Sequence, residues 1–214
     1  MSGAAYPVML DLARMRILVV GGGAVATRKV AGLLDAGGRP EVVSPEVTDE
    51  LRGMIEGGGL VWHARAYRTG DAAQFRLVFA ATDRADVNEW VADDGHAGGA
   101  LVSRADEGGE SDFHVPSHLR RDDVVVAFST GGASPLLARR LRERLEAGIV
   151  TPGLGRAARR LADVRADVQA RWADDESRRR AFWFELITPE FLDLAVAGRD
   201  EDVEQAITRC LSQS

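Results

Sequence analysis

The string Gly21-Gly22-Gly23-Ala24-Val25-Ala26 has the G-x-G-x-x-A spacing of a dinucleotide-binding turn. In such a turn the first glycine permits a tight bend, the second lets the backbone approach a diphosphate, and the alanine lets the helix pack closely. An apolar run at 16–20 precedes the string and a helical pattern follows it, so the helix N-terminus would face the diphosphate. The expected NAD-binding residues are therefore Gly21, Gly23, Ala24, Val25 and Ala26; a plain glycine turn is the alternative.

An acidic residue commonly ends the second strand of such a unit, about twenty residues further on, and hydrogen-bonds the adenosine ribose. Here Ser44-Pro45 occupies that place. A serine hydroxyl can bind a ribose hydroxyl, but it lacks the charge that repels the 2′-phosphate of NADP, so both cofactors stay open. Alternatively, Ser44 starts a turn or caps the helix after Pro45.

A further apolar run ends in small residues, Ala80-Ala81, followed by Thr82-Asp83. A bulky side chain here would obstruct a cofactor lying across the strand ends, so we expect Thr82 and Asp83 on the nicotinamide side. Either side chain could also cap the next helix, and the two roles are compatible. Asn88, inside that helix, is interpreted as a polar helix residue rather than a ligand.

Asp106 follows the fifth apolar run, at the rim where open α/β sheets bind their substrates. A carboxylate at this place could accept a proton while NAD accepts a hydride. Most aspartates in such loops are solvated, and three acids compete with Asp106 for the role: Glu107, Glu110 and Asp112.

A basic segment, residues 118–144, holds six arginines against three acids in a protein of net charge −6. Its loop Ser129-Thr130-Gly131-Gly132 precedes Ser134 as an N-cap and Pro135 at the first helical position, so exposed amides could hold an anion. A polycarboxylate substrate would suit this segment. The candidate substrate-binding residues are Ser103, Arg120, Ser129, Thr130, Gly131 and Arg139. The alternative is a solvated helix with intrahelical pairs such as Arg139 with Glu143.

Short apolar runs alternate with helical patterns up to residue 102. They predict strands at 16–20, 41–43, 60–62, 77–81 and 100–102, and helices at 24–36, 46–56 and 85–97, with Val25 and Val30 available to the core. Such alternation predicts an α/β fold with a Rossmann-like doubly wound parallel sheet. Beyond it we expect a turn at 118–123, a strand at 124–128, and helices at 135–147, 153–174, 176–187 and 200–211.

The composition, 45% hydrophobic and 28% charged, is that of a globular protein. A single cysteine, Cys210, argues against a disulfide framework and for a reducing cytoplasm. No apolar stretch reaches the roughly 18–20 residues of a membrane span, and the net charge opposes general attraction to nucleic acid. We expect no tightly held metal, because zinc-site spacing is absent among His63, His96, His114 and His118.

Together these strings resemble the precorrin-2 dehydrogenase family, which comprises the siroheme synthase N-terminal region and its stand-alone relatives. The resemblance is strong over residues 6–146 and looser in the helical tail, where Phe182-Trp183 matches. It is carried by YPVMLDL at 6–12, ILVVGGGAVATRK at 17–29, VSPE at 43–46, AATD at 80–83 with Asn88, Asp112-Phe113 with Pro116, and STGGASPLLAR at 129–139.

The resemblance implies NAD-dependent oxidation of precorrin-2 to sirohydrochlorin, a homodimer whose central module exchanges contacts between subunits, and an aspartate base that maps onto Asp106. It divides the chain into an NAD-binding Rossmann domain at 1–113, a dimerisation module at 114–147 and a helical domain at 148–214. Three residues depart from the family pattern: Ser103 replaces a common asparagine, Arg104 a small apolar residue and Gly108 a frequent proline.

Two alternatives stay open. Some relatives also insert ferrous iron or cobalt into sirohydrochlorin, so the protein could be a bifunctional dehydrogenase and ferrochelatase. A non-catalytic dinucleotide sensor acting through the helical tail is the other. The chain ends before the methyltransferase domain of the longer siroheme synthases would begin, so we expect the stand-alone form.

Overall fold

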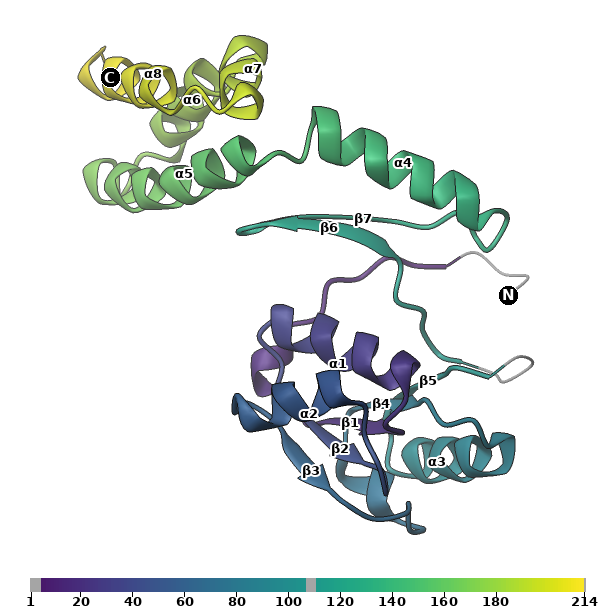
Figure 1. Ribbon diagram of the computed structural model, residues 1–214. Coiled ribbons are helices and arrows are strands. Elements are labelled where there is room, and N and C mark those ends of the chain that lie inside the picture. The colour runs from purple at the N-terminus through teal and green to yellow at the C-terminus, as the bar shows by residue number, and fades with distance from the viewer. Residues whose placement is uncertain (1–4, 107–110, 214) are drawn as a thin grey trace. The chain divides into compact units, whose positions relative to one another are not determined.

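The computed structural model describes residues 5–106 and 111–213. They fall into two compact units, the first from Tyr6 to Val115 and the second from Pro116 onward together with Ala5 (Figure 1). The first unit holds the sheet, and the second holds a hairpin and most of the helices.

The first unit carries a sheet of five parallel strands in the order β3-β2-β1-β4-β5. The strands are β1 (Ile17–Val20), β2 (Pro40–Val43), β3 (Val61–His63), β4 (Leu77–Ala80) and β5 (Leu101–Arg104). The central strand β1 pairs with both β2 and β4, so that Ile17 lies opposite Pro40 and Leu77. All residues of β1 and β4 are buried, as their continuous apolar sequences indicate. The predicted doubly wound parallel sheet is confirmed.

Helices cover both faces of the sheet, and each face has its own core. Ile17 and Val19 pack with residues of α1 (Ala24–Asp35) and α2 (Asp49–Glu56). Leu18 and Val20 point the other way and pack with residues of α3 (Ala85–Ala97) and the 3-10 helix η2 (Asp71–Gln74). A second 3-10 helix, η1 (Leu12–Arg14), precedes β1. Each large aliphatic side chain buried in this way contributes about 1.5–3 kcal/mol, which fixes the strand ends that carry the site.

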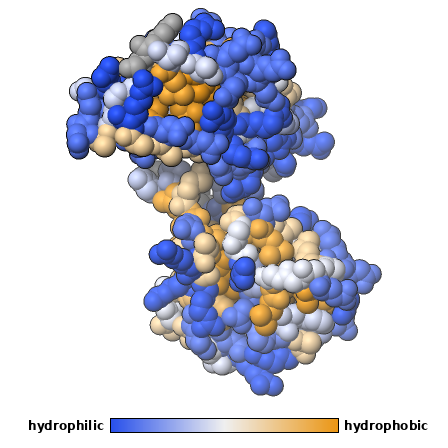
Figure 2. Space-filling model, turned by 90° about the vertical axis from the view of Figure 1, so that its left-hand side faces the viewer, coloured by the Kyte–Doolittle hydropathy of each residue, from blue (hydrophilic) through white to orange (hydrophobic). Residues whose placement is uncertain are grey.

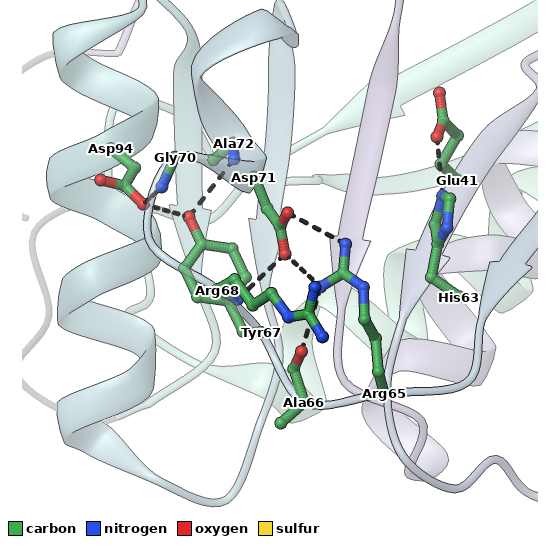
Figure 3. Close-up of polar contacts among 10 residues, drawn as sticks. All are labelled: Glu41, His63, Arg65, Ala66, Tyr67, Arg68, Gly70, Asp71, Ala72 and Asp94. Carbon is green, nitrogen blue, oxygen red and sulfur yellow. Dashed lines mark hydrogen bonds and ion pairs between the residues drawn. The ribbon is translucent and has the colours of Figure 1, made fainter.

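The crossover from β3 to β4 has a 3-10 helix where the other crossovers have an α-helix, and polar contacts hold it in place (Figure 3). The Tyr67 hydroxyl and the Gly70 amide both donate to Asp94 Oδ2, at 2.5 and 2.6 Å. Burial, together with the hydrogen bond to Asp94, raises the pKa of Tyr67, so the phenol keeps the proton that it donates. Arg65 forms a two-armed ion pair with Asp71 at 2.6 and 3.0 Å. The two contacts with Asp94 attach the crossover to α3, and the Arg65–Asp71 pair joins its beginning to η2.

The second unit begins with an antiparallel hairpin of β6 (Ser117–Arg121) and β7 (Val124–Phe128). The prediction of a turn over 118–123 is wrong, because the turn occupies only the two residues between these strands. Asp122 adopts a left-handed backbone there, with φ 52°. Only Leu119 of β6 is buried, so the strand lacks the apolar alternation that would have predicted it.

Five helices follow: α4 (Pro135–Gly148), α5 (Pro152–Arg171), α6 (Glu176–Leu186), α7 (Pro189–Ala197) and α8 (Asp200–Gln213). Helix α7 was not predicted, although Thr188 as N-cap and Pro189 at the first position are its start signals. Helices α5 to α8 enclose a core that includes Phe182 and Ile207. Within the described residues, no helix combines the length and apolarity needed to cross a membrane.

Helix α4 lies along the hairpin and leaves its apolar side chains uncovered. None of its residues is buried, and Leu136, Leu137 and Leu141 are 62%, 50% and 40% exposed. Figure 2 shows an apolar cluster framed by hydrophilic side chains on the upper unit, residues 116–213. Ser134 caps α4 and Pro135 takes its first position, as predicted.

Candidate active site

The glycine turn packs between the carboxyl ends of two strands. Gly21 has φ 121°, and a Cβ on it would lie 2.2 Å from the carbonyl oxygen of Ala81 after β4. Its amide donates to the carbonyl of Val43, the last residue of β2, at 3.0 Å. Only glycine fits this conformation and this approach, which agrees with its predicted role in the tight bend.

Gly22 is packed as tightly, although the motif treats its position as variable. A Cβ on Gly22 would lie 1.9 Å from the carbonyl oxygen of Glu46 and 2.7 Å from Ser44 Oγ. Its own carbonyl accepts from the Thr48 amide at 3.0 Å. Gly22 therefore joins the glycine turn to the loop after β2, a role that the sequence reasoning missed.

Gly23 differs, because a Cβ on it would meet no atom within 4 Å. It is the N-cap of α1, and Gly23, Ala24 and Val25 are exposed while Ala26 is fully buried. The expectation that Val25 joins the core is wrong, since the first turn of α1 faces open space on this side. An open space beside free helix N-terminal amides is what a diphosphate requires, so these residues fit a bound dinucleotide.

The loop after β2 uses Ser44 internally. The buried Ser44 hydroxyl donates to the Glu46 carbonyl at 2.6 Å, so it stabilises the turn in the way the alternative interpretation expected. The Ser44 hydroxyl oxygen can still accept a hydrogen bond from a ribose hydroxyl, and Pro45 is exposed beside it. The ribose role of Ser44 and Pro45 stays a prediction.

Thr27 and Thr48 connect the two loops. Thr27 Oγ1 donates to the Gly23 carbonyl at 3.0 Å and lies 2.8 Å from Thr48 Oγ1. Thr48 caps α2, since its hydroxyl accepts from the Leu51 amide. The pair holds the start of α1 against the start of α2.

Asn88 organises the turn after β4. Its side-chain oxygen accepts from the Thr82 amide at 3.1 Å and lies 2.8 Å from Thr82 Oγ1, while its amide nitrogen lies 3.1 Å from the Thr82 carbonyl. Asn88 lies inside α3, as the sequence indicated, but it is also fully buried and holds this turn in place, a role that was not predicted. Arg84 rather than Thr82 or Asp83 is the N-cap of α3, and Asp83 is exposed.

The same Asn88 nitrogen donates to Asp106 Oδ1 at 3.2 Å, so the candidate base lies beside the turn predicted for the nicotinamide side. Arg104, at the end of β5, pairs with both oxygens of Asp106 at 3.2 and 2.7 Å. The hydrogen bond from Arg104 holds the pKa of Asp106 below its ordinary value, and the Asn88 contact adds to the effect. Asp106 is therefore ionised at neutral pH, the state that a proton acceptor needs.

Of the three acids that compete with Asp106 for the role of base, the structure describes only Asp112. Asp112 Oδ2 accepts from the Val102 amide at 2.8 Å and lies 2.9 Å from His96 Nε2, so this exposed carboxylate is engaged in holding its segment to β5 and α3. Glu107, Glu110 and the departure at Gly108 lie outside the described residues. Ser103 is buried within β5, opposite Phe79 of β4.

The other candidate substrate-binding residues belong to the second unit. Arg120 is exposed on β6, and Ser129 Oγ accepts from the Gly131 amide at 3.1 Å in a turn where Gly131 has φ 62°. Thr130 is half-buried there. Arg139 pairs with Glu143 at 3.0 Å, which is the intrahelical contact of the alternative interpretation.

Family comparisons agree with this architecture. Residues 8–117 match the family model described as "Putative NAD(P)-binding", residues 126–148 the sirohaem biosynthesis protein central model, and residues 153–211 the sirohaem synthase dimerisation region. The chain belongs to the siroheme synthase N-terminal family. Residues 8–117 are therefore an NAD(P)-binding domain.

Relatives with this region include a siroheme synthase of Chromobacterium violaceum, 40% identical over 94% of this chain and 42% of the relative. Siroheme synthase 1 of Aeromonas salmonicida is 39% identical over 91% of this chain and 41% of the relative. The chain thus spans about two fifths of these relatives. A solved structure described as SirC, precorrin-2 dehydrogenase, superposes with a TM-score of 0.75 at 29% identity, covering 94% of this chain and 98% of that one.

Proposed function

We propose that the protein oxidises precorrin-2 to sirohydrochlorin, with NAD as the hydride acceptor. The observation that carries the proposal is an ionised carboxylate, Asp106, tied through Asn88 to the turn after β4 at the carboxyl edge of an NAD(P)-binding sheet. The solved precorrin-2 dehydrogenase, which is similar along nearly its whole length, supports the choice of substrate.

The residues present fit a dinucleotide. The space beside Gly23 is open, at the N-terminus of α1 where backbone amides can bind a diphosphate. The residue after β4, Ala81, is small and leaves room for a cofactor that lies across the strand ends. Bound NAD would supply a hydride-accepting ring. Oxidation removes two hydrogens from the substrate, one as a hydride and one as a proton, and Asp106 accepts the proton on a carboxylate oxygen.

The substrate carries carboxylates, and we propose that they bind to residues of the second unit, Arg120, Ser129, Thr130, Gly131 and Arg139; buried Ser103 lacks the exposure that such a role requires. Two of these are exposed arginines, which suit carboxylates because a guanidinium can form two parallel hydrogen bonds with one. The loop at 129–131 adds backbone amides before the N-terminus of α4.

We also propose that the chain acts as a homodimer, with a dimerisation module at 114–147 between a Rossmann domain at 1–113 and a helical domain at 148–214. The exposed leucines of α4 support this arrangement, because a monomer that leaves such a helix face uncovered presents an apolar surface to water. The match of residues 153–211 to a dimerisation region supports the homodimer, and it favours a part for the helical domain in the interface beside the module at 114–147.

The test is anaerobic incubation of the protein with precorrin-2 and either NAD or NADP, following reduced cofactor and sirohydrochlorin by absorbance. Equal amounts of both products with NAD are expected, and Asp106→Asn should abolish turnover while the protein still binds NAD. Nucleotide binding without any turnover by the unaltered protein would overturn the proposal.

A further inference from the structure

Two side chains from different elements hold the Asp106 carboxylate. Arg104 reaches it from β5 with two nitrogens, and Asn88 reaches it from α3 with its amide. Asp106 Oδ1 accepts from Arg104 Nε and Asn88 Nδ2, each at 3.2 Å, and Oδ2 accepts from Arg104 Nη2 at 2.7 Å. The carboxylate therefore has both oxygens fixed.

The Arg104 pair is sheltered compared with a matched pair nearby. The side chains of Arg104 and Asp106 are 15% and 18% exposed. Arg84 and Asp86 have the same spacing along the chain and the same two-armed contact, yet they are 64% and 50% exposed. Solvent screens the exposed pair strongly, so the sheltered pair fixes its carboxylate more firmly.

Arg104 is itself held by several partners. The hydrogen bond to Asp106 raises the pKa of Arg104, and the charges of Glu89 and Asp93 on α3 add to the effect. The Arg104 amide also donates to Ser111 Oγ at 2.9 Å, which anchors the arginine backbone. On the other side, fully buried Asn88 is held by Thr82 and cannot turn away.

We propose that Arg104 is a positioning residue for this reaction, which with Asn88 holds the Asp106 carboxylate ionised and in one orientation beside the Thr82 turn. The inference rests on the proposed function and deepens it. Asn88 ties that orientation to the turn predicted for the nicotinamide side.

Two variants separate the charge of Arg104 from the contact by which it orients Asp106. Arg104→Met removes the charge and the contact, whereas Arg104→Lys keeps the charge but loses the planar two-armed contact. With Arg104→Met, the acid limb of the kcat/KM profile should move to higher pH, because the group that lowers the pKa of Asp106 is gone. With Arg104→Lys the limb should stay near its original pH, while kcat falls roughly tenfold to a hundredfold because the base is misplaced.

Arg84→Met is the matched control and should leave the pH profile and kcat unchanged. Carbon-13 NMR titration of the aspartate carboxyls, with Asp106→Asn to assign the signal, follows the same carboxylate without turnover. In Arg104→Met the Asp106 signal should titrate at higher pH than in the unaltered protein, while the Asp86 signal stays where it was.

The outcomes separate the two proposals. If the unaltered protein fails to oxidise precorrin-2, the proposed function fails, and the NMR titration still decides whether Arg104 controls Asp106. If Arg104→Met titrates as the unaltered protein does, or if Arg104→Lys retains full kcat, the positioning role is refuted. Arg104→Lys serves as the test if Arg104→Met does not fold.

Discussion

Gly22 and Gly23 are neighbours with opposite surroundings, and alanine at each should separate folding from nucleotide binding. In Gly22→Ala the new Cβ would lie 1.9 Å from the carbonyl oxygen of Glu46, so the loop after β2 must move. Overpacking of this kind costs about 1–3 kcal/mol. Since 1 kcal/mol shifts the melting temperature of a chain this size by about 2–4 °C, we expect a fall of roughly 2–12 °C.

In Gly23→Ala the new Cβ meets nothing within 4 Å, and the extended backbone at φ −80° suits alanine. Reduced freedom of the unfolded chain stabilises by about 0.4–1 kcal/mol. Alanine is a poorer N-cap than glycine, at a cost of about 0.5 kcal/mol, so the two effects nearly cancel. The methyl group does occupy the space expected for the diphosphate, and the Kd for NAD should rise at least tenfold, which corresponds to about 1.4 kcal/mol.

Circular dichroism melts and calorimetric titration with NAD measure the two quantities separately. Gly32→Ala is the control, because Gly32 lies within α1 and also has open space around its Cβ position. It should raise stability by up to about 1 kcal/mol without changing NAD affinity. The reasoning is refuted if Gly23→Ala binds NAD with an unchanged Kd, or if Gly22→Ala has the same melting temperature as the unaltered protein.

Three further predictions follow from contacts in both units. Tyr67→Phe should lower the free energy of unfolding by about 1 kcal/mol in urea denaturation, because Asp94 loses one donor, while NAD affinity stays unchanged; a loss of NAD affinity would contradict this. Leu137→Lys should convert the proposed dimer to monomer in light scattering, and an unchanged mass would exclude α4 from the interface. The Asp106 pair with Arg104 should stabilise the fold above the ordinary aspartate pKa of about 3.9, because the folded-state pKa is lowered. The unaltered protein should therefore have a higher free energy of unfolding than Arg104→Met at pH 7, and this difference should shrink as the pH falls below about 4. A difference that grows in acid would contradict the prediction.

Most of the Rossmann unit was predictable, because its buried strands are short and continuously apolar and its helices carry clear start and stop signals. The helix at 85–97 and the strand at 124–128 have the bounds that the sequence predicted. Strand β6 was missed because only Leu119 faces a core, and α7 was missed although Thr188-Pro189 marks its beginning.

The sequence motifs predicted which residues belong to the site, but not which contacts those residues make. The glycine turn and the rim aspartate follow from spacing, whereas the roles of Gly22 and Asn88 depend on segments distant in sequence. Gly22 is constrained by the Glu46 carbonyl, and Asn88 by Asp106, which lies 18 residues away. The one sequence signal for Asn88 was its occurrence in the family motif.

Helix α4 presents its leucines to solvent within a single chain, and this has a consequence for folding kinetics. If a second copy covers that surface, the last step of assembly is bimolecular, so its rate rises with protein concentration. The melting temperature would then also depend on protein concentration, and dilution alone would lower it. Newly made chains would remain incomplete in this region until they met one another.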